Sequence, residues 1–329
     1  MGKKSYNNLL SPRQINIFYG IPNAYTSYSI GKVSPYEAFS YCYHNKLNFL
    51  ITTDQNNFFK DFMQNSSKWS SLQKTSQKFY KKHESFIPLI GFEAKTIPYG
   101  DMYIVNSKSY FLGEIKDINL LILWMLRNHD AFLIMKSPLK TTVSLPYNPI
   151  LNNIITSIEI CSGEFSKRYN RRENYYFMLL DKGWKLGAVN SQNNKDLNFG
   201  DFDNLTGIVC TKFNKENLVN AFRKRHTFSS ESRSLKLYFF ANNTFMGGIL
   251  NKSFSSLKFS IILEDPYFKI DKIEIITNGG TVLHSIDNIE LHKIKYIYEH
   301  NIENNEKWFL VKIYQEDNRI AISSPIFVE

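Results

Sequence analysis

Three carboxylates stand at or just beyond the ends of short apolar runs, where side chains often leave the core and can do chemistry. Asp54 follows the run 47–51, Glu93 follows the run 87–92, and Asp101 lies shortly beyond it. Three carboxylates can hold one hard cation such as Mg²⁺ or Ca²⁺ if the fold brings them together. The residue after Asp54 is Gln55, whose carboxamide oxygen is a poor ligand for transition metals.

Other residue types that carry chemistry give weaker signals. Lys136 and Ser137 could in principle pair as base and nucleophile, but neighbours on a strand point to opposite faces. The three cysteines are far apart and odd in number, so neither a disulfide framework nor a CxxC metal site is expected. The histidines fall near expected helix ends, where they are typical surface residues, or in the last third: His44, His83, His129, His226, His284, His292 and His300.

The net charge of +10 favours anionic partners through long-range attraction, although a composition rich in Lys, Asn and Ile is the simpler account. Basic clusters at 167–172 and 223–226 fall on segments expected to be helical, where a charge run is usually a solvated face. No helix-turn-helix, zinc-finger or aromatic RNA-binding pattern accompanies them, so nucleic-acid binding is a minor hypothesis. With no signal peptide and no apolar run near about 18 residues, we expect a cytoplasmic protein without membrane contact.

Short apolar runs alternate with amphipathic segments through the first two thirds, which indicates repeated β-α units around a parallel sheet. The clearest helix start is Ser34-Pro35-Tyr36-Glu37, where Ser34 can cap, Pro35 suits the first turn and Glu37 completes a capping box. The expected strands are 15–18, 49–52, 87–92, 102–105, 132–135, 155–160, 186–189 and 208–210, and the other expected helices are 68–83, 116–128, 168–182 and 215–225.

Beyond about residue 232 the pattern changes to strands without intervening helices. These runs are rich in β-branched and aromatic residues: 235–240, 257–263, 270–278, 291–298 and 308–314. They predict a small C-terminal β-sandwich. The expected organisation is therefore α/β, with an N-terminal segment 1–14, a β/α barrel over 15–232 and a C-terminal all-β domain over 233–329.

Taken in order, several motifs resemble the PHP (polymerase and histidinol phosphatase) superfamily, most closely its carbaryl-hydrolase-like metallohydrolases. They are the loop 20–31, Pro35 to Ala38, the strand 87–93 followed by Tyr99-Gly100-Asp101-Met102, Ser137-Pro138, 181–194, Thr206-Gly207-Ile208-Val209, 221–229 and the ending 320–327. The resemblance covers nearly the whole chain. It implies a distorted (β/α)7 barrel followed by the β-sandwich, with ligands for two or three metal ions at the carboxyl ends of the strands.

The same resemblance implies that most of the metal ligands have been replaced. Glu93 keeps the family's residue, and Asp101 could still substitute for a ligand; the other positions hold Asn23, Tyr25, Ile30, Gln55, Ser137, Gln192 and Asn194. Losing even an outer partner of a metal site typically costs about 10 to 100-fold in affinity or activity. Without metal, bound water keeps a pKa of about 15.7 instead of about 7, which is on the order of 12 kcal/mol of lost activation.

These observations leave three hypotheses open. The first is a catalytically inactive PHP-like protein, without cofactor, that binds a small polar ligand or a protein partner. Its ligand would meet a mouth lined by Asn23, Tyr25, Gln55, Glu93, Asp101, Ser137, Gln192 and Asn194. The second is a hydrolase of phosphoesters or carbamates with one divalent cation on Glu93 and Asp101, with Asp54 as a further remnant. The third is a binder of nucleic acid or another polyanion through the basic clusters.

Overall fold

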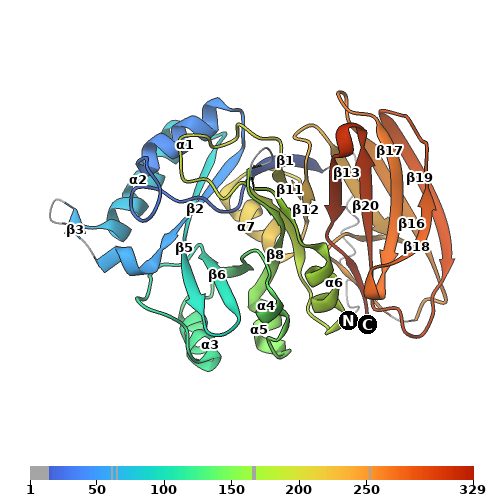
Figure 1. Cartoon of the computed structure of the whole chain (residues 1–329), viewed down its shortest axis with the longest axis horizontal. Coiled ribbons are helices and arrows are strands. Elements are labelled where there is room, and N and C mark those ends of the chain that lie inside the picture. The colour runs from blue at the N-terminus through green and yellow to red at the C-terminus, as the bar shows by residue number, and fades with distance from the viewer. Residues whose placement is uncertain (1–14, 61, 64–65, 165–167, 252) are drawn as a thin grey trace, which may run out of the picture.

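The computed structural model describes residues 15–60, 62, 63, 66–164, 168–251 and 253–329 (Figure 1). The predicted N-terminal segment 1–14 lies outside the described residues. A curled mixed sheet with helices around it forms one half of the molecule, and layered strands form the other (Figure 1). Among the described residues, no helix combines the length and apolar character that crossing a membrane requires.

The predicted strands and helices of the first two thirds are confirmed, with small shifts at their ends. The strands are β1 (Asn16–Ile21), β2 (Phe49–Gln55), β5 (Ile87–Thr96), β6 (Gly100–Val105), β7 (Phe132–Met135), β8 (Ile155–Ser162), β10 (Gly187–Ser191) and β11 (Leu205–Cys210). The helices are α1 (Pro35–His44), α2 (Lys68–Lys82), α3 (Ile118–Arg127), α6 (Glu173–Asp181) and α7 (Lys215–Arg223). At α1 the predicted capping box forms between Ser34 and Glu37.

Several short elements were not predicted. They are β3 (Phe62–Met63), β4 (Ser66–Ser67), α4 (Lys140–Val143), α5 (Pro149–Ile154), β9 (Asn170–Arg171), β12 (Thr227–Ser230), β14 (Thr244–Phe245), β15 (Ile249–Leu250), β18 (Thr281–Ile286), β21 (Ile320–Ser323) and β22 (Ile326–Val328). The prediction that the first basic cluster is helical is wrong: Arg171 lies in β9, and α6 begins only at Glu173.

The expected parallel sheet is found only in part, since β1-β2, β2-β5, β7-β8 and β8-β10 are parallel but other pairs are not. The strand order is β10-β8-β7-β6-β5-β2-β1-β11-β12, and β5-β6, β6-β7, β1-β11 and β11-β12 are antiparallel. Residues 97–99 between β5 and β6 are too few for the crossover that parallel strands need, so the chain turns back as a hairpin. The sheet curls enough to bring β10 to β11, where the Asn190 amide donates to Thr206 Oγ1 at 2.9 Å.

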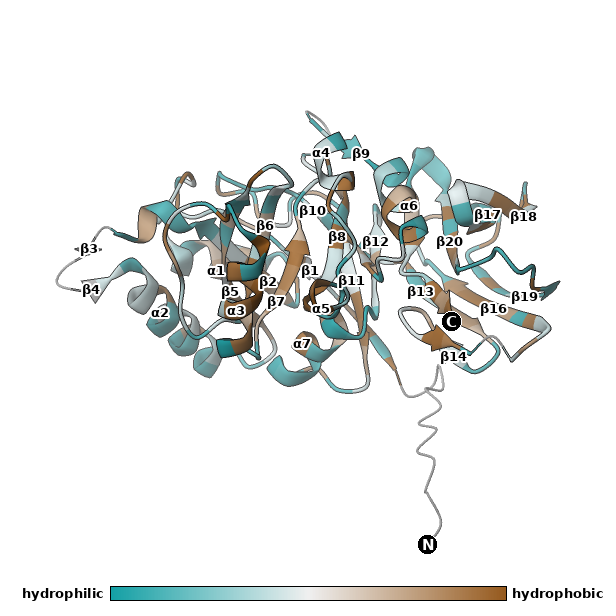
Figure 2. Cartoon of the chain, turned by 90° about the horizontal axis from the view of Figure 1, so that it is seen from below, coloured by the Kyte–Doolittle hydropathy of each residue, from teal (hydrophilic) through white to brown (hydrophobic). Residues whose placement is uncertain are grey.

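The inner face of this sheet divides into an apolar end and a polar end. Apolar side chains of several strands, including Phe49, Leu89 and Ile134, pack in one cluster with Leu218 and Phe222 of α7. Helix α7 therefore closes one end of the curled sheet. Hydrophobic segments follow the central strands, while the outer turns of α2 and α7 are hydrophilic (Figure 2).

The longer C-terminal strands form two layers, one that continues the same large sheet and one that packs against it. They are β13 (Lys236–Ala241), β16 (Ser256–Glu264), β17 (Ile270–Thr277), β19 (Lys293–Asn301) and β20 (Trp308–Gln315). Strands β14-β13-β16-β19 make a separate four-stranded sheet, and Phe239 and Phe259 from it share an apolar cluster with Ile275 and Phe309. Because β12 pairs with β21, strands from both sides of residue 232 belong to one sheet; the division into domains there stays a prediction.

Candidate functional site

Alternation along the strands places five polar residues on the inner face, at the end opposite α7. In β7, Phe132 and Ile134 belong to the inner cluster, so Lys136, the next alternate residue, continues on that face. The same alternation brings Glu93, Tyr103, Glu159 and Ser191 inward from β5, β6, β8 and β10. We call this polar end of the curled sheet the mouth.

Lys136 is the central cation of the mouth. Its ammonium lies 2.8 Å from Glu93 Oε2 and 3.3 Å from Asp101 Oδ2, and 5.6 Å from the centre of the Tyr25 ring. Burial alone lowers the pKa of Lys136, but the attraction and hydrogen bonds of Tyr25 and Glu93 hold it above its ordinary value. The ammonium therefore stays charged at neutral pH and neutralises the carboxylates that face it.

Glu93 has a full set of donors inside the protein. Its Oε2 accepts from the Tyr25 hydroxyl and from Lys136, and its Oε1 accepts from Gln55 Nε2 at 3.1 Å. Burial raises the pKa of Tyr25, with Glu93 adding to the rise against the opposing charge of Lys136, so the phenol stays protonated and donates. Glu93, with a side chain 5% exposed, is thus a hydrogen-bonded structural carboxylate.

Asp54 faces its own neighbouring loop and makes no contact with Glu93. Its carboxylate accepts from the Thr26 amide and hydroxyl, both at 2.7 Å, and from Ser29 Oγ at 2.6 Å. Burial raises its pKa, opposed by the hydrogen bonds from Ser29 and Thr26. Asp54 holds the loop after β1 in place, while Ile30 in that loop is 38% exposed and contributes no polar group.

The neutral residues expected to line the mouth are buried and mostly bonded to their own loops. Asn23 donates to the Tyr103 hydroxyl at 2.5 Å and accepts from Ser191. Gln192 donates to the Phe202 carbonyl at 2.7 Å, and Asn194 to Asn198 Oδ1 at 2.8 Å. The structure therefore gathers Tyr25, Gln55, Glu93, Asp101 and Lys136, and it places Gln192 and Asn194 in contacts that fix the segment 198–204.

Sequence reasoning missed Glu159, a fully buried carboxyl group on the inner face of β8. Its Oε2 accepts from the Ser137 amide at 3.0 Å, and its Oε1 has no partner among the described residues. Burial raises the pKa of Glu159 to about 7, although the Ser137 amide and the charge of Lys136 oppose the rise. The sequence did contain a signal for Glu159, because it is a glutamate inside the apolar run 155–160. Glu is almost never fully buried unless it is paired.

A cavity of about 500 Å³ opens at the mouth between the β5-β6 turn and the segment after β7. Its polar lining includes Lys95, Asp101, Lys136, Ser137, Thr141 and Arg172. Arg172 donates to the Pro138 carbonyl at 2.9 Å, while its buried Nε has no partner among the described residues. Positive groups therefore outnumber the single carboxylate in this lining, which suits a polar ligand with negative charge.

The donor set of the mouth does not fit a transition-metal centre. Among the described residues, no three His, Cys, Asp or Glu side chains lie close enough together to hold a metal ion. Asp54 is directed at Thr26, and the ammonium of Lys136 lies against both Glu93 and Asp101. A divalent ion on these two carboxylates would have to displace that ammonium.

Comparison with known proteins supports the fold and leaves the chemistry open. No protein-family model and no curated protein matches the sequence. Among solved structures, the chain is similar to a two-domain protein from Bacteroides vulgatus that contains a predicted PHP-like metal-dependent phosphoesterase, with a TM-score of 0.56 and 13% identity over 95% of each chain. The predicted resemblance to the PHP superfamily thus holds at the level of the fold.

Two further similarities are weaker. PsfC from Pseudomonas syringae matches with a TM-score of 0.42 and 10% identity over 59% of this chain and 82% of that one. Endonuclease Q, in complex with a 27-mer duplex substrate that has an abasic lesion at the active site, matches with a TM-score of 0.40 and 11% identity, over 63% of this chain and 57% of that one.

Proposed function

We propose that this chain is a PHP-type pseudo-metallohydrolase, related to the carbaryl-hydrolase-like branch, that binds a small polar ligand at its mouth without hydrolysing it. In this proposal the family's metal ligands have been replaced, and no metal or other cofactor is required. The β/α part serves as a binding scaffold.

The contact between Lys136 and two carboxylates carries the proposal. Glu93 and Asp101 are the residues that the resemblance marks as a retained and a substitute ligand, and both face the ammonium, at 2.8 and 3.3 Å. A positive charge from the chain itself thus balances them. An ammonium neutralises carboxylates, but it cannot supply the Lewis acidity by which a metal activates water.

The ligand suggested by the mouth is a small anion. Lys136, Arg172 and Ser137 line one cavity, and the buried Nε of Arg172 has no partner among the described residues. Arginine and lysine bind carboxylate or phosphate oxygens through charge-assisted hydrogen bonds. With inorganic phosphate as the probe, we expect Arg172→Met to weaken binding measured by calorimetry, whereas Lys81→Met on an exposed turn of α2 leaves it unchanged.

Metal analysis of the purified protein tests the loss of metal chemistry. We expect substoichiometric transition metal and no phosphatase activity that chelation abolishes. Two or three tightly bound ions per chain, together with phosphatase activity lost on chelation, would contradict the proposal.

The alternative is a hydrolase with one divalent cation on Glu93 and Asp101. It requires Lys136 to leave its present position and predicts that Glu93→Ala abolishes a measurable esterase or carbamate hydrolase activity. Our proposal predicts a loss of stability only. A cation-dependent activity in the wild-type protein that disappears in Glu93→Ala would decide for the alternative.

Polyanion binding receives less support from the contacts of the basic clusters. Arg171 pairs with Glu231 at 2.6 Å, Arg172 donates to Pro138, and Arg225 Nε donates to the Gly247 carbonyl at 3.0 Å. Arg171 and Arg225 are thus engaged within the protein, and Arg172 keeps only its buried Nε without a partner among the described residues. Retardation of DNA or RNA that falls steeply with salt would restore this hypothesis.

A further inference from the structure

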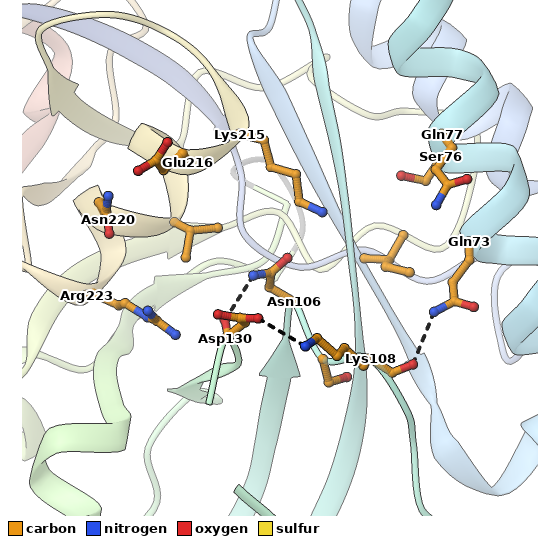
Figure 3. A pocket seen from close by; sticks show the side chains of 13 residues that line it. Gln73, Ser76, Gln77, Asn106, Lys108, Asp130, Lys215, Glu216, Asn220 and Arg223 are labelled. Carbon is orange, nitrogen blue, oxygen red and sulfur yellow. Dashed lines mark hydrogen bonds and ion pairs between the residues drawn. The ribbon is translucent and has the colours of Figure 1, made fainter. Parts of the chain in front are cut away.

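A second cavity, of about 650 Å³, lies at the end of the curled sheet opposite the mouth, between α2 and α7 (Figure 3). The ends of β6 and β7 that lie away from the mouth border this cavity. Asp101 and Lys136 at the mouth lie at the start of β6 and just after β7, whereas Asn106 and Asp130 in this cavity follow β6 and precede β7. We call this cavity the α7 groove; of its lining, the sequence analysis had singled out only Arg223, in the basic cluster 223–226.

Part of its polar lining is fixed by contacts within the protein. Arg223 donates to the His129 carbonyl at 2.5 Å, Asn106 donates to the Asp130 carbonyl at 2.9 Å, and Gln73 donates to the Lys108 carbonyl at 3.2 Å. Lys108 also pairs with Asp130 at 3.6 Å (Figure 3). These contacts hold the groove's walls without using up their donors, since a guanidinium carries five N–H groups.

Other polar groups in the groove have no partner among the described residues. They include the hydroxyl of Ser107, which is only 6% exposed, the half-buried side-chain amide of Asn220, and the exposed ammonium of Lys215 and amide of Gln77. Desolvation lowers the pKa of Lys215 against the opposing attraction of Asp130. A buried hydroxyl without a partner costs free energy that a ligand can recover, while the exposed ammonium of Lys215 stays open to water and available to a ligand.

The helix α7 presents these groups as an ordered set. Lys215, Val219 and Arg223 follow one another at i, i+4 and i+8, so they lie on one face of the helix. Two cations therefore stand on this face of α7 with an apolar side chain between them, and the lining also holds the carboxylates of Glu216 and Asp130. Across the groove, α2 contributes Gln73, Ser76 and Gln77 (Figure 3).

We propose that the α7 groove binds a small phosphorylated, hydroxyl-rich compound of the sugar phosphate class. Lys215 and the free donors of Arg223 bind the phosphate through charge-assisted hydrogen bonds. The carboxamides of Gln77 and Asn220 both donate and accept, which matches hydroxyl groups that do the same. The volume falls within the roughly 300–1,000 Å³ typical of ligand pockets. This site is independent of the function proposed for the mouth.

Calorimetric titration of the full chain with ribose 5-phosphate tests the site, with ribose and inorganic phosphate as the two partial ligands. We expect ribose 5-phosphate to bind more tightly than either. Lys215→Met should weaken it at least tenfold, and Gln77→Ala and Asn220→Ala should weaken it to a smaller degree. Lys81→Met, which removes the same charge from an exposed turn of α2, and Lys95→Met at the mouth should leave the affinity unchanged.

Three results would overturn the proposal. They are the absence of binding at millimolar ribose 5-phosphate, equal weakening by Lys215→Met and Lys81→Met, and weakening by Lys95→Met alone, which would place the ligand at the mouth. Circular dichroism establishes that each variant is folded. If Lys215→Met does not fold, Gln77→Ala and Asn220→Ala carry the same test, because both side chains lie in the groove without a partner.

Discussion

The two ends of the curled sheet treat their polar side chains in opposite ways. At the mouth, Glu93 accepts from Tyr25, Gln55 and Lys136, so its charge is balanced inside the protein. In the α7 groove, Lys215 and Gln77 make no hydrogen bond or ion pair with any described residue. The carboxylate of Glu93 at the mouth is therefore satisfied by contacts within the protein, whereas the two groove side chains have no such contacts among the described residues.

The largest effect on stability is expected when Lys136, the cation that balances the carboxylates of the mouth, is replaced. Lys136→Met leaves Glu93 buried without its cation, and removal of one partner from a buried pair is strongly destabilising. Because the Lys136 side chain is 24% exposed, we expect a loss of about 3 kcal/mol, at the low end of such effects. Chemical denaturation at pH 7 measures it.

The matched control is Lys95→Met, which removes an exposed mouth lysine paired with Glu114 at 3.1 Å and should cost no more than about 1 kcal/mol. If Glu93 and Asp101 are freed by Lys136→Met, added Mg²⁺ should also raise the melting temperature of that variant more than that of the wild type. If the two lysine variants lose the same stability, Lys136 is not the cation that balances Glu93 and Asp101.

Glu159→Gln tests a buried carboxyl group of the mouth whose Oε1 has no partner among the described residues. The folded-state pKa of about 7 lies above the ordinary 4.5, so the folded protein binds this proton more tightly than the unfolded chain does. Stability therefore falls as the pH rises from about 4.5 to about 7. The full effect is on the order of 3 kcal/mol, and the amide's own burial cost reduces the expected gain of Glu159→Gln to about 2 kcal/mol at pH 8.

The gain should shrink as the pH falls and become a loss of about 1 kcal/mol near pH 4.5, where only the amide's burial cost remains, and this pH dependence separates ionisation from packing. In the wild type, the titration of His226 offsets part of the fall in stability that Glu159 causes as the pH rises. Burial, aided by the charges of Lys224 and Arg225, lowers its pKa from 6.5 to about 4, so its contribution is lost as the pH falls below 6.5. The measurement is thus the difference between variant and wild type at each pH; a constant difference would exclude titration of Glu159.

Much of the fold followed from local pattern, whereas the partners of the site residues did not. Short apolar runs such as 132–135 became strands, and Ser34 and Glu37 formed the predicted cap. The antiparallel β5-β6 pair escaped prediction because strand direction is set by a short connection and not by periodicity. Residues near the ends of strands were identified as candidate site residues, but their hydrogen bonds depend on contacts across the sheet.

Lys136 illustrates this limit. Lys136 is next to Ser137 in the sequence, so the two could in principle form a base and nucleophile. The alternation of side chains along a strand argued against that pair. The actual partner of Lys136, Glu93, lies 43 positions away in the chain, and no local rule brings the two together. Glu159 and Lys215 were missed because their surroundings also come from distant parts of the chain: Glu159 accepts from the Ser137 amide, and Lys215 lines a cavity with residues of α2.

A moderate effect is expected from Asp54→Ala, which tests whether this carboxylate is a structural residue of the mouth. The substitution leaves the Thr26 amide and the hydroxyls of Thr26 and Ser29 without their acceptor. We expect a loss of about 1.5 kcal/mol. Ser29→Ala, which removes only one of these bonds, should cost less. If Asp54→Ala instead leaves stability unchanged and alters a cation-dependent activity, the single-metal alternative gains support.

The smallest effect on stability is expected in the α7 groove. It gives the clearest contrast with the mouth. Because the ammonium of Lys215 has no partner among the described residues and is partly desolvated, its removal breaks no contact. Lys215→Met should therefore change the free energy of unfolding by less than about 0.5 kcal/mol, or raise it slightly. Denaturation of this variant, together with the calorimetric titration, tests whether Lys215 serves to bind a ligand. A large loss of binding with no loss of stability supports that role. A stability loss comparable to that of Lys136→Met would show that the two ends do not differ.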